Sequence, residues 1–367
     1  DSRLSFQEGA ENVVGDALVA SALAHIEHPY PVHRPDVTLK KGRHFESGYA
    51  DHVQAGTDGN ELCDYDLIGS RSASTALFAL QQVEQVDLLY LPPPGNGSDL
   101  GPAAVLAAER FCRERGAMLV IDPRMEWATP VQAAHGVREL GYISSHMIGY
   151  FPRADLRDGS STQSHSVGGA IAGLLCRHDR KQGAWQDLDP DGIPLSQVLL
   201  PAVDVSDNDR QLLKRAGLNV IAKGAASRAR LYGSVTMRCN SGTPREFSSL
   251  SVQRFCLQVI NSVAAGARWS VFEQKNDALA KRVRAQVSAY FVGLANMGAL
   301  ADAQFVVKCD SGVSRREDSS VHGVTILLAF HPAQAAVPVS LTLHLTPAGC
   351  RVGSTAFAPT AGEFLPV

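Results

Sequence analysis

The 367-residue sequence lacks the features of membrane-inserted and secreted proteins. No apolar run approaches the roughly 18 residues that a transmembrane helix needs. The first residues do not place a basic stretch before an apolar one, so the sequence predicts no signal peptide. The sequence also begins without Met, which indicates a processed or trimmed chain or part of a longer product. We therefore expect no membrane insertion.

A strong excess of charge of either sign is also missing. The net charge is −3 at pH 7, and charged residues make up 19% of the sequence. No overall basic field is therefore present to attract nucleic acid, which is not expected as a partner. Apolar residues make up 45%, which is ordinary for a globular protein, and the length allows two or three domains.

Patterns typical of disulfide frameworks and metal sites are absent as well. The seven cysteines are odd in number, far apart and without a C-x-x-C pair, and most lie in apolar runs. They indicate buried free thiols in a reducing cytosol. Three histidines near the N-terminus have no supporting carboxylate or cysteine pattern, and prolines interrupt them, so we expect a surface segment and no metal. These are His25, His28 and His33.

What the sequence does contain is an alternation of strand and helix patterns. A first helix is predicted over Val13–His28. Farther on, "VDLLYLP" and "AMLVIDP" are short continuous apolar runs, typical of strands buried on both faces. The helix-forming segment Gly101–Gly116 lies between them and ends at a glycine. A strand, a helix and a strand in this order over Val83–Asp122 predict a βαβ unit and a parallel sheet.

The C-terminal half predicts a helix over Arg245–Gly266 and a buried strand at "RWSVF". A polar turn follows, in which Asn276 or Asp277 is expected to cap the next helix. That helix, Asp277–Gly298, has an apolar stripe at helical spacing. Three further strands are predicted, the last two as a hairpin: Phe305–Asp310, His322–Phe330 and Val337–Leu345.

Two patterns resemble those of enzymes. In the first, Gly95, Gly97 and Gly101 follow a predicted strand and precede a helix, and Asp122 stands where a ribose-binding acid is found in dinucleotide-binding folds. The spacing is G-x-G-x-x-x-G, however, and the three prolines before it remove backbone donors that a phosphate needs. A connecting loop at the sheet edge is favoured, and a nucleotide-binding α/β enzyme stays as an alternative.

The second pattern is the chain order of Asp122, His165 and Ser234, which is that of subtilisin-type proteases. His165 lies in a polar, serine-rich stretch, and order alone does not make a catalytic triad. We therefore predict no catalytic set, with the three side chains beyond hydrogen-bond reach of one another.

Several motifs together resemble a known family. "QAGTDGNELCDYDLIG", "VGGAIAGLLCRHDRKQGAW", "LYGSVTM", "GARWSVFEQKNDAL" and "FVVKCD" occur in the order of matching motifs in contractile phage tail sheath proteins. The resemblance extends from about Gln54 to Leu345 and is to the phage and extracellular-injection branch. Two short motifs depart from the family pattern: "YFP" stands for "Y-P-W", and "LYG" stands for "V-W-G". Each keeps an aromatic residue of similar volume. The extended N-terminal arm of sheath subunits has no obvious counterpart in residues 1–50.

The resemblance implies a subtilisin-like α/β sheath domain at 58–231 and a C-terminal α+β sheath domain at 232–352. An N-terminal segment, 1–57, and a tail, 353–367, flank them. The function implied is that of a non-enzymatic subunit of a contractile sheath, without a cofactor, which surrounds an inner tube and drives it through a target envelope. The chain would be made in the bacterial cytoplasm and then stand in a virion tail or an extracellular injection particle.

The partners implied by the resemblance are other copies of the chain in a helix or ring, the inner tube protein, and baseplate and terminator proteins. Lys281, Arg282 and Arg284 are the inner-tube contact that it suggests, and Arg282 is expected to be the least buried of them. A solvated helix face is the alternative for these cations. A sheath-related cap or baseplate-proximal ring adaptor is the alternative for the whole chain.

Overall fold

The computed structural model describes residues 59, 61–95, 97–156, 164–188, 190–196, 198–224, 228–238, 244–309 and 323–357. The chain divides into two compact units, Asp1–Asn60 and Glu61–Val367, and the described residues belong almost entirely to the second. The helix predicted over Val13–His28 and the histidines near it lie outside the described residues. Within the described ranges, no helix combines the length and the hydrophobicity that crossing a bilayer requires.

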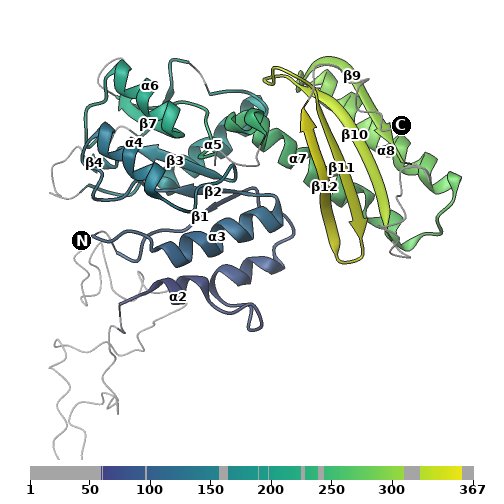
Figure 1. Ribbon diagram of the computed structural model, residues 1–367, viewed down its shortest axis with the longest axis horizontal. Helices are drawn as coiled ribbons and strands as arrows, with labels where there is room; N and C mark the ends of the chain where they lie inside the picture. Colours follow the sequence, from purple (N-terminus) through teal and green to yellow (C-terminus); the bar gives the residue numbers. More distant parts are fainter. Residues whose placement is uncertain are drawn as a thin grey trace, which may run out of the picture. The chain divides into compact units, whose positions relative to one another are not determined.

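The first part of the second unit is built on a six-stranded sheet of order β1-β2-β3-β7-β8-β5 (Figure 1). The first four strands run parallel, whereas β8 is antiparallel to both of its neighbours. The sheet is therefore mixed, and the sequence prediction of a largely parallel sheet holds for β1, β2, β3 and β7. The strands are β1 (Leu88–Tyr90), β2 (Met118–Ile121), β3 (Met147–Phe151), β5 (Ile193–Pro194), β7 (Leu218–Lys223) and β8 (Ala229–Tyr232).

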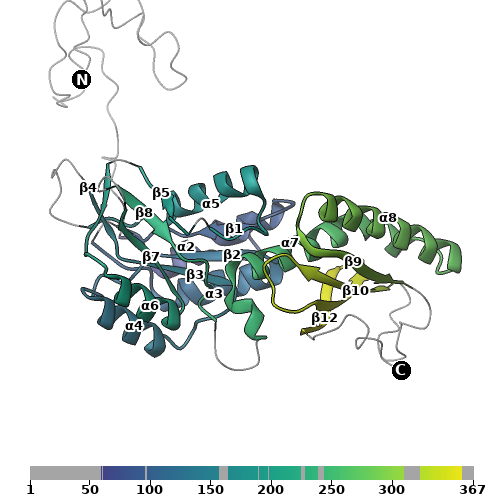
Figure 2. The same ribbon diagram turned by 90° about the horizontal axis from the view of Figure 1, so that it is seen from above.

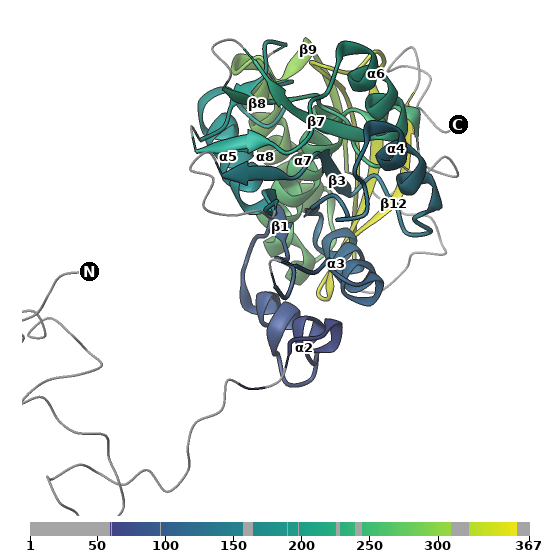
Figure 3. The ribbon, with the colours of Figure 1, turned by 90° about the vertical axis from the view of Figure 1, so that its left-hand side faces the viewer.

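Helices cover both faces of this sheet (Figures 2 and 3). Neighbouring residues of β2 pack in two different hydrophobic cores. Leu119 belongs to the core on the side of α3, α4 and α6, and Val120 belongs to the core on the side of α5. Burial on both faces is the reason that these strands read as continuous apolar runs. The helices are α2 (Asp64–Ile68), η1 (Ala76–Gln82), α3 (Pro102–Arg115), α4 (Pro130–Glu139), α5 (Gly168–Gln182) and α6 (Asp207–Ala216), and a small sheet pairs β4 (Ala154–Leu156) with β6 (Leu199–Pro201).

The predicted βαβ unit is confirmed. β1 and β2 pair in parallel with Leu88 opposite Met118, and α3 connects them. Pro102 stands in the first turn of α3, where a missing N–H costs no helical hydrogen bond. Gly116 ends α3 with a left-handed φ of 65°, and its carbonyl accepts a hydrogen bond from Asn261 Nδ2 at 3.0 Å.

The sequence assigned no strand to β3, although all five of its residues are buried between β2 and β7. Gly149 interrupts the local pattern because glycine has a low strand propensity. In the fold, a side chain at Gly149 would come within 2.7 Å of Leu218 and of Met237. The close approach of these distant residues requires the glycine, and nothing in the local sequence encodes it.

The second part is a four-stranded antiparallel sheet of order β12-β11-β10-β9, with α7 and α8 along one face (Figures 1 and 2). Phe330 of β10 is central to its core: its ring lies 5.8 Å from that of Phe255 and 5.1 Å from that of Phe291. The predicted hairpin is confirmed, with β10 and β11 antiparallel. The elements are η3 (Arg245–Ser248), α7 (Leu250–Ala267), η4 (Arg268–Phe272), α8 (Asp277–Asn296), β9 (Leu300–Lys308), β10 (Val324–Pro332), β11 (Val339–Thr346) and β12 (Gly349–Phe357).

The strand predicted at "RWSVF" is wrong. These residues form η4, a 3₁₀ helix that continues directly from α7. Ser270 Oγ donates to the carbonyl of Ala267 at 2.6 Å, which holds the turn, and Val271 is buried while Phe272 is 72% exposed. The predicted cap of α8 is confirmed, since the Asn276 side chain accepts from the backbone N–H of Leu279.

Two further findings differ from the sequence prediction. The sequence predicts no strand beyond Leu345, yet β12 pairs with β11 and crosses the boundary expected between residues 352 and 353. Cys63, Cys112, Cys176, Cys256 and Cys350 are free thiols, as expected, but Cys63 and Cys176 are exposed. Burial raises the pKa of the Cys256 thiol to about 12, so this thiol is a structural apolar group.

Substitution of Phe291 tests the core of the second sheet. Phe291 is fully buried between two other phenylalanines, so Phe291→Ala should lower the free energy of unfolding by about 3–5 kcal/mol. The adjacent Val292 is 50% exposed on the same helix, and Val292→Ala should change the free energy of unfolding by less than about 1 kcal/mol. Urea titrations of the two variants provide the comparison. Equal losses would contradict the orientation of α8 described above.

Candidate functional site

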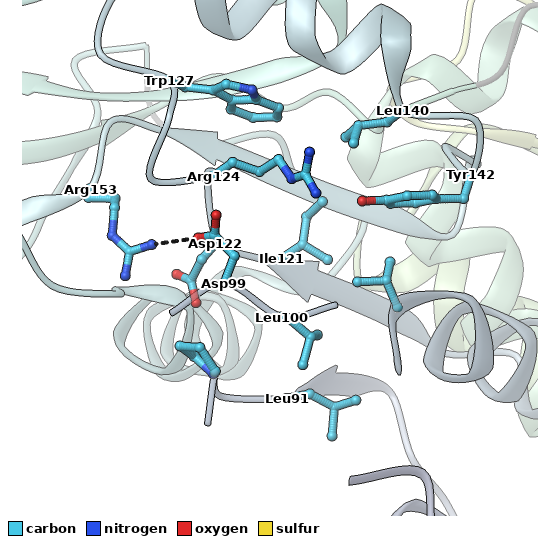
Figure 4. Close-up of a pocket in the computed structure, with 12 residues that line it drawn as sticks. Leu91, Asp99, Leu100, Ile121, Asp122, Arg124, Trp127, Leu140, Tyr142 and Arg153 are labelled. Atoms are coloured by element: carbon cyan, nitrogen blue, oxygen red, sulfur yellow. Dashed lines mark hydrogen bonds and ion pairs between the residues drawn. The ribbon is translucent and has the colours of Figure 1, made fainter. Parts of the chain in front are cut away.

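The first candidate site is the carboxyl edge of β1 and β2, where α/β folds bind their ligands. The described residues enclose a cavity of about 30 Å³ there. This volume is close to that of one water molecule and excludes a nucleotide. Figure 4 shows the lining side chains, which are Leu91, Pro93, Asp99, Leu100, Val105, Ile121, Asp122, Arg124, Trp127, Leu140, Tyr142 and Arg153.

The N-terminus of α3, where a phosphate would bind, is occupied by the chain's own carboxylate. Asp64 accepts hydrogen bonds from the backbone N–H groups of Gly101 at 3.0 Å and of Ala104 at 3.1 Å. These are the unsatisfied donors at the positive end of the helix dipole that an anion would otherwise take. A side chain at Gly101 would overlap the Asp64 carboxylate, which explains this glycine. Gly95 only closes a turn, in which its N–H donates to Ser98 Oγ.

Asp122 also serves a helix of the chain itself. One carboxylate oxygen accepts from the backbone N–H groups of Val167 at 3.0 Å and of Gly168 at 2.9 Å, at the start of α5. The other oxygen accepts from the Tyr90 hydroxyl at 2.7 Å. Burial, and then the negative charge of Asp122, raise the pKa of Tyr90 above its ordinary value, so this hydroxyl remains a donor. Asp122 therefore has no free oxygen directed at a ribose.

A buried arginine joins the loops at this edge. Arg153 is 5% exposed, and its guanidinium donates to Asp99 at 3.3 Å, to the carbonyl of Pro123 at 3.2 Å and to Ser166 Oγ at 2.7 Å (Figure 4 draws the bond to Asp99). Asp99 in turn accepts from the backbone N–H of Met125. Arg153 and Asp99 thus connect the loops that carry Pro123, Met125 and Ser166, and only the Arg153 Nε stays without a hydrogen-bond partner among the described residues.

The three residues in protease order are not brought together. Asp122 bonds as described above, Ser234 Oγ donates to Asp187 Oδ1 at 3.0 Å, and the backbone of His165 pairs with Ala154. No hydrogen bond joins Asp122, His165 and Ser234, all of which the structure describes. The arrangement has neither an activated nucleophile nor a base oriented toward one.

The second candidate site is the surface of α8. Lys281, Arg282 and Arg284 are all exposed, and the apolar stripe of the helix faces the core. Their surroundings differ, because the Arg282 guanidinium lies 4.4 Å from the centre of the Trp269 ring. This cation–π contact anchors Arg282 to η4 and leaves Lys281 and Arg284 as the freer charges.

Trp269 is itself fixed by α8. Its indole N–H donates to Gln286 Oε1 at 2.9 Å, and Gln286 Nε2 donates to the carbonyl of Gly266 at 2.9 Å. The junction of α7, η4 and α8 is thus a bonded corner, which presents its cations on a rigid support. The sequence showed the cations but not this support, because Trp269 and Gln286 are brought together only by the turn between the helices.

Comparison with known proteins agrees with this fold. Residues 243–346 match the family model of the phage tail sheath C-terminal domain. A comparison with curated protein sequences finds no match.

Solved structures similar to this chain include sheath proteins. One is the contracted PVC sheath of an extracellular contractile injection system, with 18% identity, a TM-score of 0.58, and 72% of each chain covered. Another is the contracted helical sheath of the anti-feeding prophage, with 20% identity, a TM-score of 0.57, and 70% of this chain and 69% of that one covered. A sheath tail protein from Desulfitobacterium hafniense has 13% identity and a TM-score of 0.52, over 73% of this chain and 58% of that one.

The fold is thus a sheath-like one, a mixed α/β sheet followed by an antiparallel sheet. The match of residues 243–346 to the phage tail sheath C-terminal domain agrees with the family that the sequence motifs indicated.

Removal of the Asp64 carboxylate tests the role of the first site. Asp64→Ala leaves two partly buried helix donors unpaired and should lower the free energy of unfolding by about 1–2 kcal/mol. Glu61→Ala, at an exposed position nearby, is the control and should be neutral within about 0.5 kcal/mol. ATP or a dinucleotide should leave the melting temperature of the wild type unchanged. Ligand at 100 times its Kd would add about 2.7 kcal/mol, so a clear rise in melting temperature would contradict the structural assignment.

Proposed function

We propose that this chain is the structural subunit of a contractile sheath, which surrounds a rigid inner tube and shortens to drive it through a target envelope. The observation that carries the proposal is the match of residues 243–346 to the sheath C-terminal domain, joined to a sheath-like fold over most of the described chain. The filled carboxyl edge of the first sheet supports a role without catalysis.

Contraction in this proposal needs no nucleotide. The subunits assemble in an extended, metastable arrangement, and the energy of firing is the difference between two packings of the same folded subunits. Loops that are held by hydrogen bonds favour such a contraction, because each subunit then moves as a rigid body. The Arg153 hydrogen bonds at the sheet edge and the paired Trp269 and Gln286 side chains support such rigidity.

The finer domain description is part of the proposal. We assign a subtilisin-like domain to about 58–231 and a sheath C-terminal domain that begins at about 232 and runs past the expected boundary at 352 to the end of β12 at Phe357. Four parallel strands with helices on both faces support the first, and the antiparallel sheet with α7 and α8 supports the second.

We assign the inner-tube contact to the cationic face of α8. The exposure of Lys281, Arg282 and Arg284 on a braced helix supports this assignment. Exposed ion pairs are individually worth only about 0–1 kcal/mol and are weakened by salt. Repeated over many subunits, they hold a sheath extended and still break together, which is what a triggered release requires.

Neighbouring subunits are linked, in this proposal, by strands added to the second sheet. β12 and β9 are its outer strands, and each pairs with one neighbour within the described part of the chain. An open strand edge takes another strand through backbone hydrogen bonds. Baseplate and terminator proteins are the further partners proposed, and the particle is assembled in the producing bacterium before release.

A ring-forming adaptor is a second candidate. One similar structure is the six-fold baseplate of the anti-feeding prophage, with 19% identity, a TM-score of 0.55, and 70% of this chain and 68% of that one covered. A baseplate chain of this fold supports a role in a closed ring at the end of the tube.

Negative-stain microscopy of the purified chain, with and without its tube protein, tests the two candidates. The sheath proposal predicts tubes of stacked rings whose length follows the length of the inner tube. Closed rings that never stack would favour the adaptor. Monomers under every condition, together with a nucleotide-dependent melting temperature, would contradict both.

Charge reversal on α8 tests the tube contact. Lys281→Glu with Arg284→Glu should reduce co-sedimentation with the tube at least about tenfold, because several weak attractions become repulsions in every subunit. The melting temperature should stay nearly unchanged, since both side chains are exposed. Lys214→Glu with Arg215→Glu on α6 makes the same charge change on another helix and should assemble normally. Unaltered co-sedimentation of the α8 variant would remove this surface from the proposal.

A further inference from the structure

A groove between α5 and β5 has no part in the function proposed above. It has a volume of about 850 Å³ and lies along one face of α5, opposite the last strand of the first sheet (Figure 2 shows α5 and β5 side by side). Residues of α5 three and four apart line it, among them Gly173, Arg177, His178 and Lys181. Arg228, just before β8, lines the other side.

The charge of this groove is unbalanced. Among its described lining residues there is no carboxylate. Arg177, Lys181 and Arg228 make no ion pair or side-chain hydrogen bond in the part of the chain that the structure describes. The nearest acid on α5, Asp179, is held by the guanidinium of Arg254 on another side of the helix, so it does not offset them.

A buried histidine gives a second, independent observation. His178 is 8% exposed and lines the groove, and neither of its ring nitrogens has a hydrogen-bond partner. The Asp179 carboxylate lies 3.7 Å from its Nδ1, which is beyond hydrogen-bond distance. Buried polar side chains in folded proteins are normally paired, and an unpaired one requires an explanation. A carboxylate bound in the groove brings an acceptor to this side of α5.

The groove also has an apolar floor and room for a backbone. Leu174 and Leu195 line it and are buried, and Ile193 of β5 is half-buried. At Gly173 no atom lies within 4 Å of the place that a side chain would take, so this face of α5 is open. β5 is the last strand of its sheet, and an extended peptide lies naturally against such an edge. Pro194 has no N–H, so side-chain charges must supply much of the recognition.

We propose that this groove binds an extended acidic segment of a partner protein. Its carboxylates pair with Arg177 and Lys181 on one rim and with Arg228 on the other, while its small apolar side chains cover the floor. A free phosphate or a nucleic acid fits less well. The cations lie on both rims of the groove, Arg177 and Lys181 on α5 and Arg228 before β8, so an extended chain with several carboxylates reaches them together better than one compact anion does. No phenylalanine, tyrosine or tryptophan lines the groove for base stacking among its described residues.

Fluorescence anisotropy with a labelled peptide of alternating Glu and Val tests this proposal on the full chain. The wild type should bind this peptide and should not bind the matched peptide of alternating Gln and Val. Arg177→Glu with Lys181→Glu should weaken binding at least about tenfold. Arg180→Glu is the matched control, since Arg180 lies on the same helix outside the groove, and it should bind within about twofold of the wild type.

Gly173→Leu provides a second variant that does not depend on charge. The open space at Gly173 accepts the side chain, and leucine favours the helix, so the melting temperature should be unchanged or raised while peptide binding is lost. Failure of the wild type to bind the Glu peptide, or unchanged binding in both variants, would overturn the proposal. Displacement of the peptide by polyphosphate or single-stranded DNA at lower concentration would replace it with a phosphate-binding site. The measurement uses single chains, so its outcome is separate from that of sheath assembly.

Discussion

Helix N-termini that point into a protein need negative charge, and the first sheet meets this need from within the chain. Asp64 and Asp122 bind the N-terminal donors of α3 and α5, while Asp99 holds Met125 and the buried Arg153. Each carboxylate satisfies donors that would otherwise be costly to bury. The edge at which many α/β proteins bind a nucleotide is therefore closed by the fold itself, and this closure makes the domain a rigid block.

Rigidity of this kind agrees with a structural role. An enzyme keeps its carboxyl edge open, with polar groups directed at a substrate. Here these groups bond to one another, and only a cavity near the size of one water remains. The features that face outward are instead charged helix surfaces on rigid supports: the cations of α8 above Trp269 and those of α5 beside β5. Weak contacts on such surfaces act together when a subunit is repeated many times.

In both sheets, the elements that local sequence patterns encode were predictable, and most of the others were not. The βαβ unit, the cap at Asn276 and the hairpin of β10 and β11 follow from local patterns, because apolar periodicity and capping residues act over a few positions. The 3₁₀ helix at "RWSVF" was mistaken for a strand, because a short apolar run does not distinguish the two. β3 was missed because Gly149 is set by neighbours distant in sequence.

The sequence by itself indicated a resemblance to sheath proteins, through ordered motifs, and the cationic character of α8, through the spacing of Lys281 and Arg284 against the apolar stripe. Only the tertiary structure decided what the candidate site residues do. Asp64 stands 37 positions before Gly101, so no local rule connects them, and the fold alone places its carboxylate at the start of α3. Likewise, Arg177 and Arg228 form one groove only because β8 and β5 bring them together. Local sequence patterns determine the helices and strands. The groups that pair with helix N-termini and with charged side chains come together only in the folded chain.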